Sequence, residues 1–236
     1  MPSPTQYSVI VPAAGIGKRM KAACPKQYLN ILGKPIIEHT LENLLAHPQI
    51  KTVVVALNPN DTVFKTLAIS KHPNLEIVTG GKERSDSVLA GLNYLPDNEK
   101  WVLVHDAARP CLQHSDLSAL LNLADTGPHG GILAAPVRDT MKRGVLTANK
   151  RQSRVKHTES RDNLWHALTP QFFPLPLLKH ALSSALLKGV EITDEASAIE
   201  FISETVLLVE GRASNIKVTQ PEDLLLAEFY LSQPNN

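Results

Sequence analysis

The stretch that decides the fold is Ser8-Val9-Ile10-Val11-Pro12-Ala13-Ala14-Gly15-Ile16-Gly17-Lys18-Arg19-Met20. Its apolar start predicts a buried strand over 8–11, and its small residues predict a tight loop directly after the strand. Small residues at such a position let backbone N–H groups approach a phosphate closely. The loop is not a Walker A motif, because no Gly-Lys-Ser/Thr ends it, and Met20 replaces the third glycine of a dinucleotide fingerprint. It is a candidate phosphate-binding loop, with an ordinary surface loop as the alternative.

Beyond this loop, short apolar runs alternate with amphipathic stretches. The runs predict strands over 52–57, 75–78, 101–104 and 131–137. The amphipathic stretches predict helices over 35–45, 61–69, 85–94 and 115–124. Strands that alternate with helices indicate an α/β fold with a parallel sheet covered on both faces. Because ligands bind at the carboxyl ends of such strands, we expect a functional edge at the loops after Val11, Val78 and Val104.

In the C-terminal part, predicted helices and strands occur again. It predicts helices over 176–187 and 194–202, a strand over 205–209 and a short strand over 216–218. The last helix is expected to open with Thr219-Gln220-Pro221-Glu222, a capping box with an early proline. No internal repeat or linker is visible, so we expect a single domain over residues 1–236.

Residues 138–161 interrupt this pattern. Eight of these 24 residues are Lys or Arg, and only Asp139 and Glu159 are acidic. A segment with so few apolar positions cannot bury itself. Composition alone favours a flexible charged loop, with a hairpin arm as the other interpretation.

The overall composition narrows the class of protein. With 43% apolar residues among 236, the chain can build a packed core, and 24 basic against 23 acidic residues give no electrostatic support for a nucleic-acid or membrane-surface role. No run of 18 apolar residues exists. Cys24 and Cys111 are too few for a disulfide framework, and the start has no secretory-signal pattern. We therefore expect a cytoplasmic protein.

Cations and polar groups follow the predicted strands. Arg19 and Lys26, the latter in Pro25-Lys26-Gln27, could bracket a triphosphate, although both could be ordinary surface cations. Asp106, at the end of the strand over 101–104, could hold a ribose hydroxyl, a metal ion or a substrate, or could simply form a turn. Ser87, after the Gly80-Gly81 pair, could read a base edge, although helix capping is the commoner role.

Six motifs occur in a fixed order between about Val9 and Tyr230. They are Pro12-Ala13-Ala14-Gly15-x-Gly17-x-Arg19-Met20, Pro25-Lys26-Gln27-Tyr28, Gly80-Gly81-x-x-Arg84-x-Asp86-Ser87-Val88, His105-Asp106-Ala107-Ala108-Arg109-Pro110, Thr193-Asp194-Glu195-Ala196 and Asn215-Ile216-Lys217-Val218-Thr219. Together they closely resemble the 2-C-methyl-D-erythritol 4-phosphate cytidylyltransferases of the non-mevalonate isoprenoid pathway. The resemblance implies a Rossmann-like nucleotidyltransferase domain with a mainly parallel central sheet and a protruding β-arm.

The resemblance also implies a reaction, in which CTP and methylerythritol phosphate give a CDP-alcohol and pyrophosphate. A phosphate oxygen of the substrate would attack the α-phosphorus of CTP in line, so the enzyme's task would be positioning and charge stabilisation. Mg²⁺ would sit mainly on the nucleotide phosphates, so no metal-binding residues of the protein are expected.

Matching positions imply a role for each motif residue. The catalytic group comprises Arg19 and Lys26, which would stabilise the transition state, and Arg161 and Lys217, which would grip the attacking phosphate. The substrate-binding group comprises Asp106, Thr140, Arg161, Thr193 and Lys217. The nucleotide-binding group comprises Pro12, Ala13, Ala14, Gly15, Gly17, Gly81, Ser87, Asp106 and Ala107. Of these, Gly81 and Ser87 would read the cytosine.

The basic segment resembles a β-arm that crosses to a second subunit, which implies a homodimer whose two sites each borrow residues from the partner. The dimerisation arm would cover about 138–161. One departure is Lys82, which occupies a position where many relatives carry an acid. Two other functions remain open: cytidylyl transfer to ribitol 5-phosphate, and a non-catalytic nucleotide-binding regulator, against which the intact cations argue.

Overall fold

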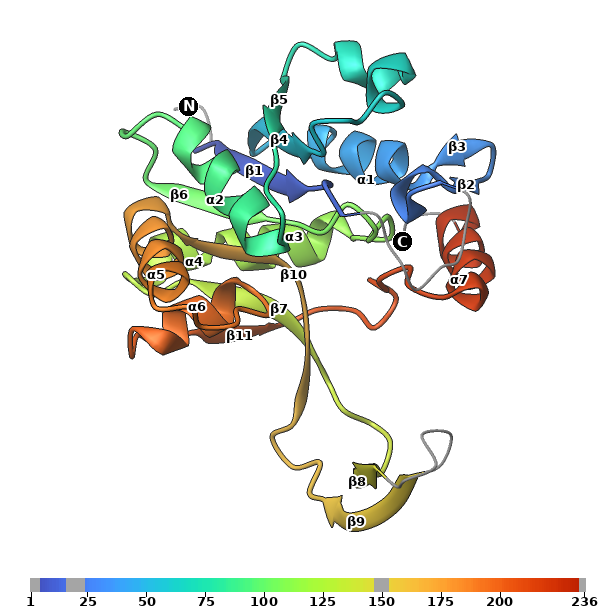
Figure 1. Ribbon diagram of the computed structural model, residues 1–236, viewed down its shortest axis with the longest axis vertical. Coiled ribbons are helices and arrows are strands. Elements are labelled where there is room, and N and C mark those ends of the chain that lie inside the picture. Colours follow the sequence, from blue (N-terminus) through green and yellow to red (C-terminus); the bar gives the residue numbers. More distant parts are fainter. Residues whose placement is uncertain (1–4, 16–23, 147–152, 234–236) are drawn as a thin grey trace.

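A twisted central sheet organises the structure, a computed structural model that describes residues 5–15, 24–146 and 153–233 (Figure 1). In this described part the main sheet has seven strands in the order β11-β7-β10-β6-β1-β4-β5. Their bounds are β1 Tyr7–Pro12, β4 Ile50–Leu57, β5 Leu75–Thr79, β6 Trp101–Val104, β7 Gly131–Pro136, β10 Trp165–Pro174 and β11 Leu207–Glu210. All neighbouring pairs are parallel except those of β10, which runs antiparallel to β6 and β7. The predicted α/β fold with a mainly parallel sheet is confirmed.

Helices cover both faces of this sheet, because its strands alternate apolar side chains between the two faces. One face packs on α2 (Arg84–Tyr94), α5 (Leu175–Leu187) and α6 (Glu195–Phe201), around buried residues such as Ile10. The other face packs on α1 (Ile36–Leu45) and α3 (His114–Leu121), around Val9 and Val11. These three β1 side chains are fully buried, which explains the continuous apolar run in the sequence.

The remaining elements lie at the margins of the sheet. The short antiparallel pair β2 (Asn30–Ile31) and β3 (Lys34–Pro35) follows the 3-10 turn η2 (Lys26–Tyr28), and α4 (Leu123–Thr126) continues from α3. Helix α7 (Pro221–Ser232) buries Ala227 in a small cluster with Ile31 and Val218. This cluster attaches the C-terminal helix beside the loop that follows β6, which also contributes Ala108. Within the described ranges, no helix is both long and apolar enough to cross a membrane.

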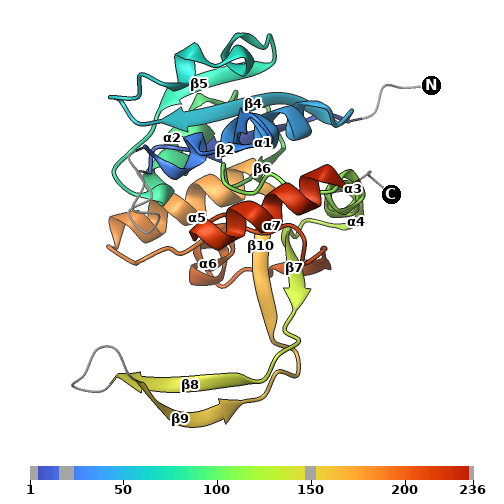
Figure 2. The same cartoon turned by 90° about the vertical axis from the view of Figure 1, so that its right-hand side faces the viewer.

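The basic segment forms a hairpin that projects far from the body (Figures 1 and 2). Its strands β8 (Met141–Leu146) and β9 (Ser153–Glu159) are antiparallel, and the hairpin leaves the sheet between β7 and β10. Across the pair, Arg143 Nε lies 2.8 Å from Glu159 Oε1. The arm is therefore an ordered hairpin in its described part, and the interpretation as a flexible loop is wrong.

Three sequence expectations need correction. The helix expected over 61–69 is instead the 3-10 turns η3 (Phe64–Thr66) and η4 (Ala68–Lys71), because Leu67 between them is extended. Helix 115–124 is divided into α3 and α4. The strand expected over 216–218 is absent from the described structure, because the backbone of Val218 bonds to Ala108 and Lys26 instead of a sheet neighbour.

The position of two further features differs from expectation. The sequence pattern does not predict strand β10, which includes Pro170, a residue that normally argues against a central strand. The register of the β10–β7 pair shifts between Ala167 and Gln171, so the proline sits in an irregularity of that ladder. The last helix begins with Gln220 as N-cap and Asp223 as the reciprocal residue, one position later than the expected box.

Candidate active site

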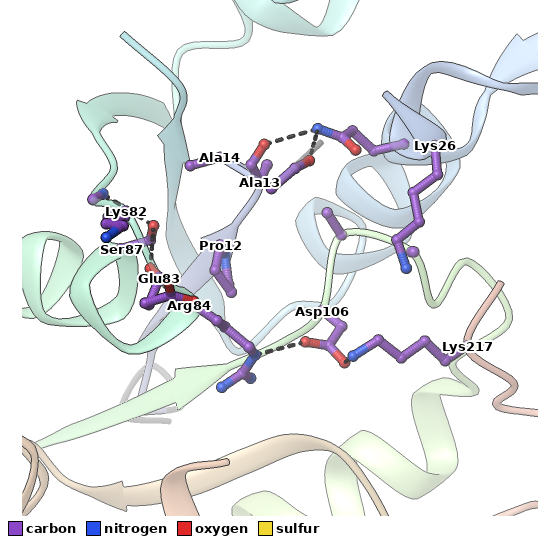
Figure 3. Close-up of a pocket in the computed structure, with 15 residues that line it drawn as sticks. Pro12, Ala13, Ala14, Lys26, Lys82, Glu83, Arg84, Ser87, Asp106 and Lys217 are labelled. Carbon is purple, nitrogen blue, oxygen red and sulfur yellow. Dashed lines mark hydrogen bonds and ion pairs between the residues drawn. The ribbon is translucent and has the colours of Figure 1, made fainter. Parts of the chain in front are cut away.

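The loops after β1, β5 and β6 meet at the carboxyl edge of the sheet and line a cavity of about 230 Å³ (Figure 3). This is the edge that the strand pattern predicts. The lining residues are Pro12, Ala13, Ala14, Gly15, Lys26, Gln27, Gly81, Lys82, Glu83, Arg84, Ser87, Asp106, Ala107, Ala108 and Lys217. The site thus combines backbone-rich small residues with cations and two acidic residues, of which Asp106 is the buried one.

Gln27 holds the loop after β1 in shape. Its buried side-chain amide donates to the carbonyls of Ala13, at 2.8 Å, and Gly15, at 3.3 Å. At the start of the loop, the Ala13 N–H donates to Ala56 O in β4. Because one buried amide holds two loop carbonyls, the turn from Ala13 to Gly15 is fixed by the Pro-Lys-Gln segment that also carries Lys26.

The loop after β5 touches the loop after β1. A Cβ atom on Gly80 would lie 2.7 Å from Ala14 Cβ and 2.9 Å from Ser87 Oγ, so only glycine permits this approach. The Gly81 N–H donates to Ser87 Oγ at 3.1 Å, and that hydroxyl donates to Glu83 O. Glu83 is the N-cap of α2, with Asp86 as its reciprocal partner, so the expectation that Ser87 caps the helix is wrong. The Ser87 hydroxyl instead faces the cavity with one acceptor position left.

Asp106 is the electrostatic centre of the site. Its Oδ2 lies 2.7 Å from Lys217 Nζ and 3.6 Å from Arg109 Nε, and its Oδ1 accepts from Arg84 Nε at 3.1 Å. Burial alone would raise the pKa of this carboxyl, but Arg84, Lys217 and Arg109 together hold it well below its usual range. Asp106 therefore stays ionised and offers its remaining lone pairs to hydroxyl donors.

Lys26 lies across the cavity from Arg84 (Figure 3). Its Nζ donates to the Val218 carbonyl at 3.0 Å. The nearby carboxyl of Asp223 is partly desolvated, but hydrogen bonds from Thr219 and Gln220 and the charge of Lys26 lower its pKa. The Val218 contact places Lys26 and Lys217 on one side of the cavity, although 191 positions separate them in the sequence.

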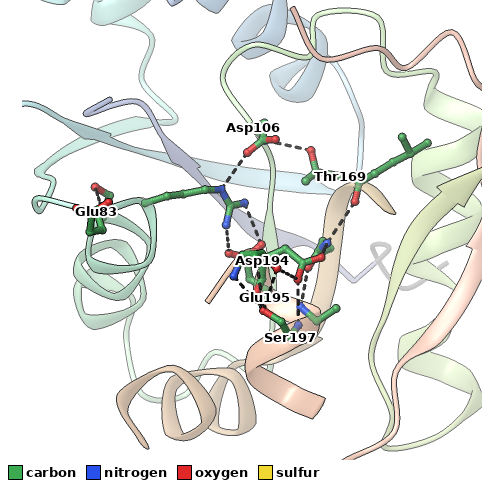
Figure 4. A network of polar contacts seen from close by, with 12 residues as sticks. Glu83, Asp106, Thr169, Asp194, Glu195 and Ser197 are labelled. Atoms are coloured by element: carbon green, nitrogen blue, oxygen red, sulfur yellow. Dashed lines mark hydrogen bonds and ion pairs between the residues drawn. The ribbon is translucent and has the colours of Figure 1, made fainter. Parts of the chain in front are cut away.

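A chain of buried groups supports the loop after β6. His105 is fully buried, and burial lowers its pKa to about 4, so the ring is neutral. Its Nε2 lies 3.1 Å from Arg109 O, and its Nδ1 lies 3.0 Å from Thr169 Oγ1, which accepts from the Asp106 N–H (Figure 4). A neutral ring with its proton on Nε2 satisfies all three groups. The Asp106 backbone is thereby tied to β10.

A second cavity of about 240 Å³ adjoins the first. Its lining shares Arg84, Asp106 and Lys217 with the first cavity. The additional lining residues are Arg109, Ala167, Leu168, Thr169, Gln171, Thr193 and Asp194. Two neighbouring cavities that share one carboxylate and one lysine can hold two reactants whose reacting groups meet between them.

The sequence-predicted residues are distributed unevenly around these cavities. Most of the nucleotide-binding group lines the first cavity, with Lys26 and Lys217, and Thr193 lines the second. Thr140 and Arg161 are exposed at the base of the arm, where Arg161 donates to the Arg138 carbonyl, and they belong to neither lining. Arg19 and Gly17 lie outside the described residues.

Comparison with known proteins places these features in a family. A family model described as 2-C-methyl-D-erythritol 4-phosphate cytidylyltransferase matches residues 7–233. The chain belongs to this family. A protein of that name from Pseudoalteromonas atlantica is 64% identical over 225 residues, or 95% of each chain, and one from Citrobacter koseri is 58% identical with the same coverage.

Solved structures of the family agree in fold. The cytidylyltransferase of Francisella tularensis superposes with a TM-score of 0.81 at 33% identity, covering 96% of this chain and 100% of the other. That of Thermus thermophilus gives a TM-score of 0.80 at 29% identity, covering 97% and 100%. The Rossmann-like nucleotidyltransferase fold implied by the six motifs is thus confirmed.

Several residues of this site have roles that the sequence pattern does not predict. Arg84 and Glu195 lie within the quoted motifs, but their mutual contact joins positions 111 apart. Gln27 and Asn215 bind backbone groups instead. Asn215 Nδ2 donates to Thr169 O, and the backbone carbonyl of Asn215 accepts from Arg109 Nη1. The only sequence signal for such a role is a polar residue that lies inside a motif but has no evident contact with a reactant.

Proposed function

We propose that this chain transfers the cytidylyl group of CTP to 2-C-methyl-D-erythritol 4-phosphate, giving 4-diphosphocytidyl-2-C-methyl-D-erythritol and pyrophosphate in the non-mevalonate isoprenoid pathway. The observation that carries the proposal is the family match over residues 7–233, which includes every loop around the two cavities. The first cavity would hold CTP, and the second would hold the alcohol phosphate.

In this reaction a phosphate oxygen of the alcohol phosphate attacks the α-phosphorus of CTP. The new P–O bond forms as the bond between the α-phosphorus and the bridging oxygen breaks, and pyrophosphate leaves with that electron pair. Lys26, with Arg19, stabilises the negative charge that grows on the phosphates. Lys217, which lines both cavities, orients the attacking phosphate, so that its binding energy is used to align the reacting atoms.

The nucleotide contacts follow the linings. Ala13, Ala14, Gly15 and Gly81 present backbone to the base and phosphates, while Asp106 accepts from a hydroxyl. Ser87 donates to Glu83 and receives from Gly81, so it can only accept one more hydrogen bond. The 4-amino group of cytosine is a donor and matches it, whereas the 4-oxo group of uracil does not.

Mg²⁺ fits this site as an ion carried by the nucleotide. Both oxygens of Asp106 already contact cations, and the described ranges contain no group of three or more His, Cys, Asp or Glu side chains that could hold a metal ion. An ion held by triphosphate oxygens needs no such group. Bound there, it would neutralise phosphate charge, while Lys26 and Lys217 act on the reacting phosphates themselves.

The arm has its own part in the proposal. We propose that residues 1–236 form one nucleotidyltransferase domain that dimerises through the arm at about 138–161, which delivers Thr140 and Arg161 to the partner's site. Support comes from the distance of the arm from its own body and from exposed Val145, Val155 and Leu146 on its strands. The free thiols of Cys24 and Cys111 suit a cytoplasmic location.

A substrate panel tests the proposed function. CTP, UTP and ATP are each incubated with methylerythritol, ribitol and glycerol phosphates, and pyrophosphate release is measured. Release is expected with CTP and methylerythritol phosphate above all other pairs. A preference for ribitol phosphate would reassign the alcohol, and absence of release with every pair would contradict an enzymatic function.

A further inference from the structure

Glu195 is a fully buried carboxylate that touches neither cavity. It occupies the first turn of α6, and none of its side-chain surface is exposed. It is absent from both cavity linings, which do include its neighbours Asp194 and Thr193 on the second cavity. A buried charge is costly unless it is paired with good geometry, so the fold maintains Glu195 for a specific contact.

That contact is a two-pronged ion pair with Arg84. Arg84 Nη1 donates to Glu195 Oε1 at 2.6 Å, and Nη2 donates to Oε2 at 3.0 Å. Burial alone would lower the pKa of Arg84, but Glu195 and Asp106 raise it above its usual value, so the guanidinium stays charged. A planar guanidinium held at two nitrogens has its plane and its third donor direction fixed.

The third donor points at Asp106. Arg84 Nε donates to Asp106 Oδ1 at 3.1 Å, so one guanidinium connects the buried carboxylate of α6 with the carboxylate shared by both cavities (Figure 4). Arg84 itself lines both cavities and its side chain is 27% exposed, so without the second acid it would be free to turn towards a phosphate. Guanidinium groups bind phosphate well, which makes such a turn favourable.

We propose that Glu195 is a positioning residue for the reaction: it locks Arg84 onto Asp106 and so fixes the Asp106 carboxylate between the two reactants. This inference rests on the proposed function, because it assumes that Asp106 contacts a substrate hydroxyl. Glu195 acts only through Arg84 and touches no reactant. The consequence is that the N-terminal turns of α2 and α6 set the geometry of a loop that belongs to neither helix.

A double-mutant cycle tests this positioning role. The steady-state kcat/KM for CTP and for methylerythritol phosphate is measured for the wild type, Glu195→Gln, Asp106→Asn and the double variant. Because displacement of a group by about 1 Å can cost roughly 100-fold, Glu195→Gln is expected to lower kcat/KM about 10- to 100-fold. In the Asp106→Asn background the same change should cost less than about threefold, since coupled residues are not additive.

Glu99→Gln is the matched control. Glu99 is also a buried carboxylate in an ion pair, 2.5 Å from Lys51 Nζ, but it lies before β6, away from both cavities. We expect Glu99→Gln to lower the thermal midpoint as Glu195→Gln does, yet to keep wild-type kcat/KM. Equal losses of activity in the two variants would mean a general effect of a buried defect and would overturn the positioning role.

Arg84→Lys keeps the inference testable if Glu195→Gln does not fold. A lysine retains the charge but cannot hold two carboxylates through a rigid fork, so kcat/KM should again fall and again be non-additive with Asp106→Asn. Normal turnover by Glu195→Gln or Arg84→Lys, or the same loss in both backgrounds, would overturn the inference. An inactive wild type would instead contradict the proposed function.

Discussion

At the scale of single residues, Asp106 explains why so many cations can gather in one place. Arg84, Arg109 and Lys217 surround the buried carboxylate of Asp106, and Glu195 supplies a second negative charge beside Arg84. Without these acids the cations would repel one another, and burying them would carry a large desolvation penalty. The acids therefore allow a cationic site to exist before any phosphate arrives.

Lys26 should act chiefly in the transition state. Its replacement by Ala removes a cation beside the phosphates, and loss of one such stabilising donor costs roughly 10²–10³ in rate, so kcat/KM should fall by about that factor. Lys34→Ala is the control, since Lys34 is an exposed lysine of β3 that pairs with Glu42 of α1 and lines neither cavity. Near-normal turnover by Lys26→Ala would make it a surface cation.

Ser87 should govern the choice of base. Ser87→Ala removes the acceptor for the cytosine amino group, and a lost hydrogen bond of this kind is worth roughly 1 kcal/mol, so the preference for CTP over UTP should fall about five- to tenfold. Competition between the two nucleotides in one assay measures this ratio directly. Ser85→Ala, two positions earlier in α2, should leave the ratio unchanged. An unaltered ratio in Ser87→Ala would place base recognition elsewhere.

His105 should make the fold sensitive to acid. Its pKa is about 4 in the folded protein, against roughly 6.5 in an unfolded chain. Between these pH values the unfolded state binds a proton that the folded state does not. The contribution of neutral His105 to the free energy of unfolding is therefore fully present above pH 6.5, and about 3 kcal/mol of it is lost as the pH drops towards 4. Urea unfolding of the wild type and His105→Asn at several pH values checks this. The stability difference between them should shrink towards pH 4, and a constant difference would contradict it.

At the scale of elements, the closeness of α2 to the sheet positions Arg84 and Ser87. Gly91 makes this possible, because a Cβ atom there would lie 2.6 Å from Ile10 Cγ2, and Ile10 is fully buried in β1. A helix pushed outward at Gly91 would carry Arg84 and Ser87 away from the cavity with it.

Gly91→Val should therefore destabilise the fold and lower activity together. Overpacking of a close core contact typically costs about 1–3 kcal/mol, and we expect a loss in this range in the free energy of unfolding. Ala90→Val, at a half-buried position of the same helix, is the control for introducing valine into α2. Because valine has a higher helix propensity than glycine, propensity alone would not destabilise Gly91→Val. If the two variants unfold at the same denaturant concentration, the tight contact has no energetic weight.

The sequence predicts elements well where pairing and packing are local. The strand over 8–11, its loop, and the meeting of three loops at one edge follow from apolar runs and from the rule for parallel sheets. Strand β10 could not be predicted, because its pairing with β6 and β7 is non-local and its proline argues against a strand. The 216–218 segment has the apolar pattern of a strand, but its backbone serves Lys26 and Ala108.

Within the site, too, local position can be predicted and distant contacts cannot. Motif residues that face the cavity, such as Lys26 and Ser87, could be proposed from their position after a strand. The Arg84–Glu195 contact could not, because it depends on α2 and α6 covering the same sheet face, and that arrangement follows from the strand order. Residue types indicate chemistry, whereas partners separated by a hundred residues require the topology.

At the scale of the whole molecule, the arm separates two groups of predicted site residues. Lys217 lies at the cavities, and Arg161 lies at the base of the arm outside both linings. If one site uses Lys217 from one subunit and Arg161 from the other, then Lys217→Ala and Arg161→Ala homodimers should each be nearly inactive.

Mixing the two variants should restore activity. Co-refolded chains form mixed dimers in which one site carries both defects and the other carries none. With random pairing about half of the dimers are mixed, so about a quarter of all sites should recover in a two-fold symmetric shared site. Specific activity is compared with that of each variant alone, after native mass spectrometry shows that mixed dimers have formed. No recovery would place Arg161 in its own subunit's site or outside any site.

Because β10 lies in the middle of the sheet, the sheet cannot be completed until late in the synthesis of the chain. Strands β1, β4, β5 and β6 are neighbours in the sheet and are all made by residue 104, so they can pair early. Strand β7 comes next, but both of its neighbours, β10 and β11, are made later. At about 5–20 residues per second, the open edge of β6 waits several seconds until the arm and β10 have been translated. The nascent protein is then most exposed to wrong pairing, so chaperones would matter most while the arm is being synthesised.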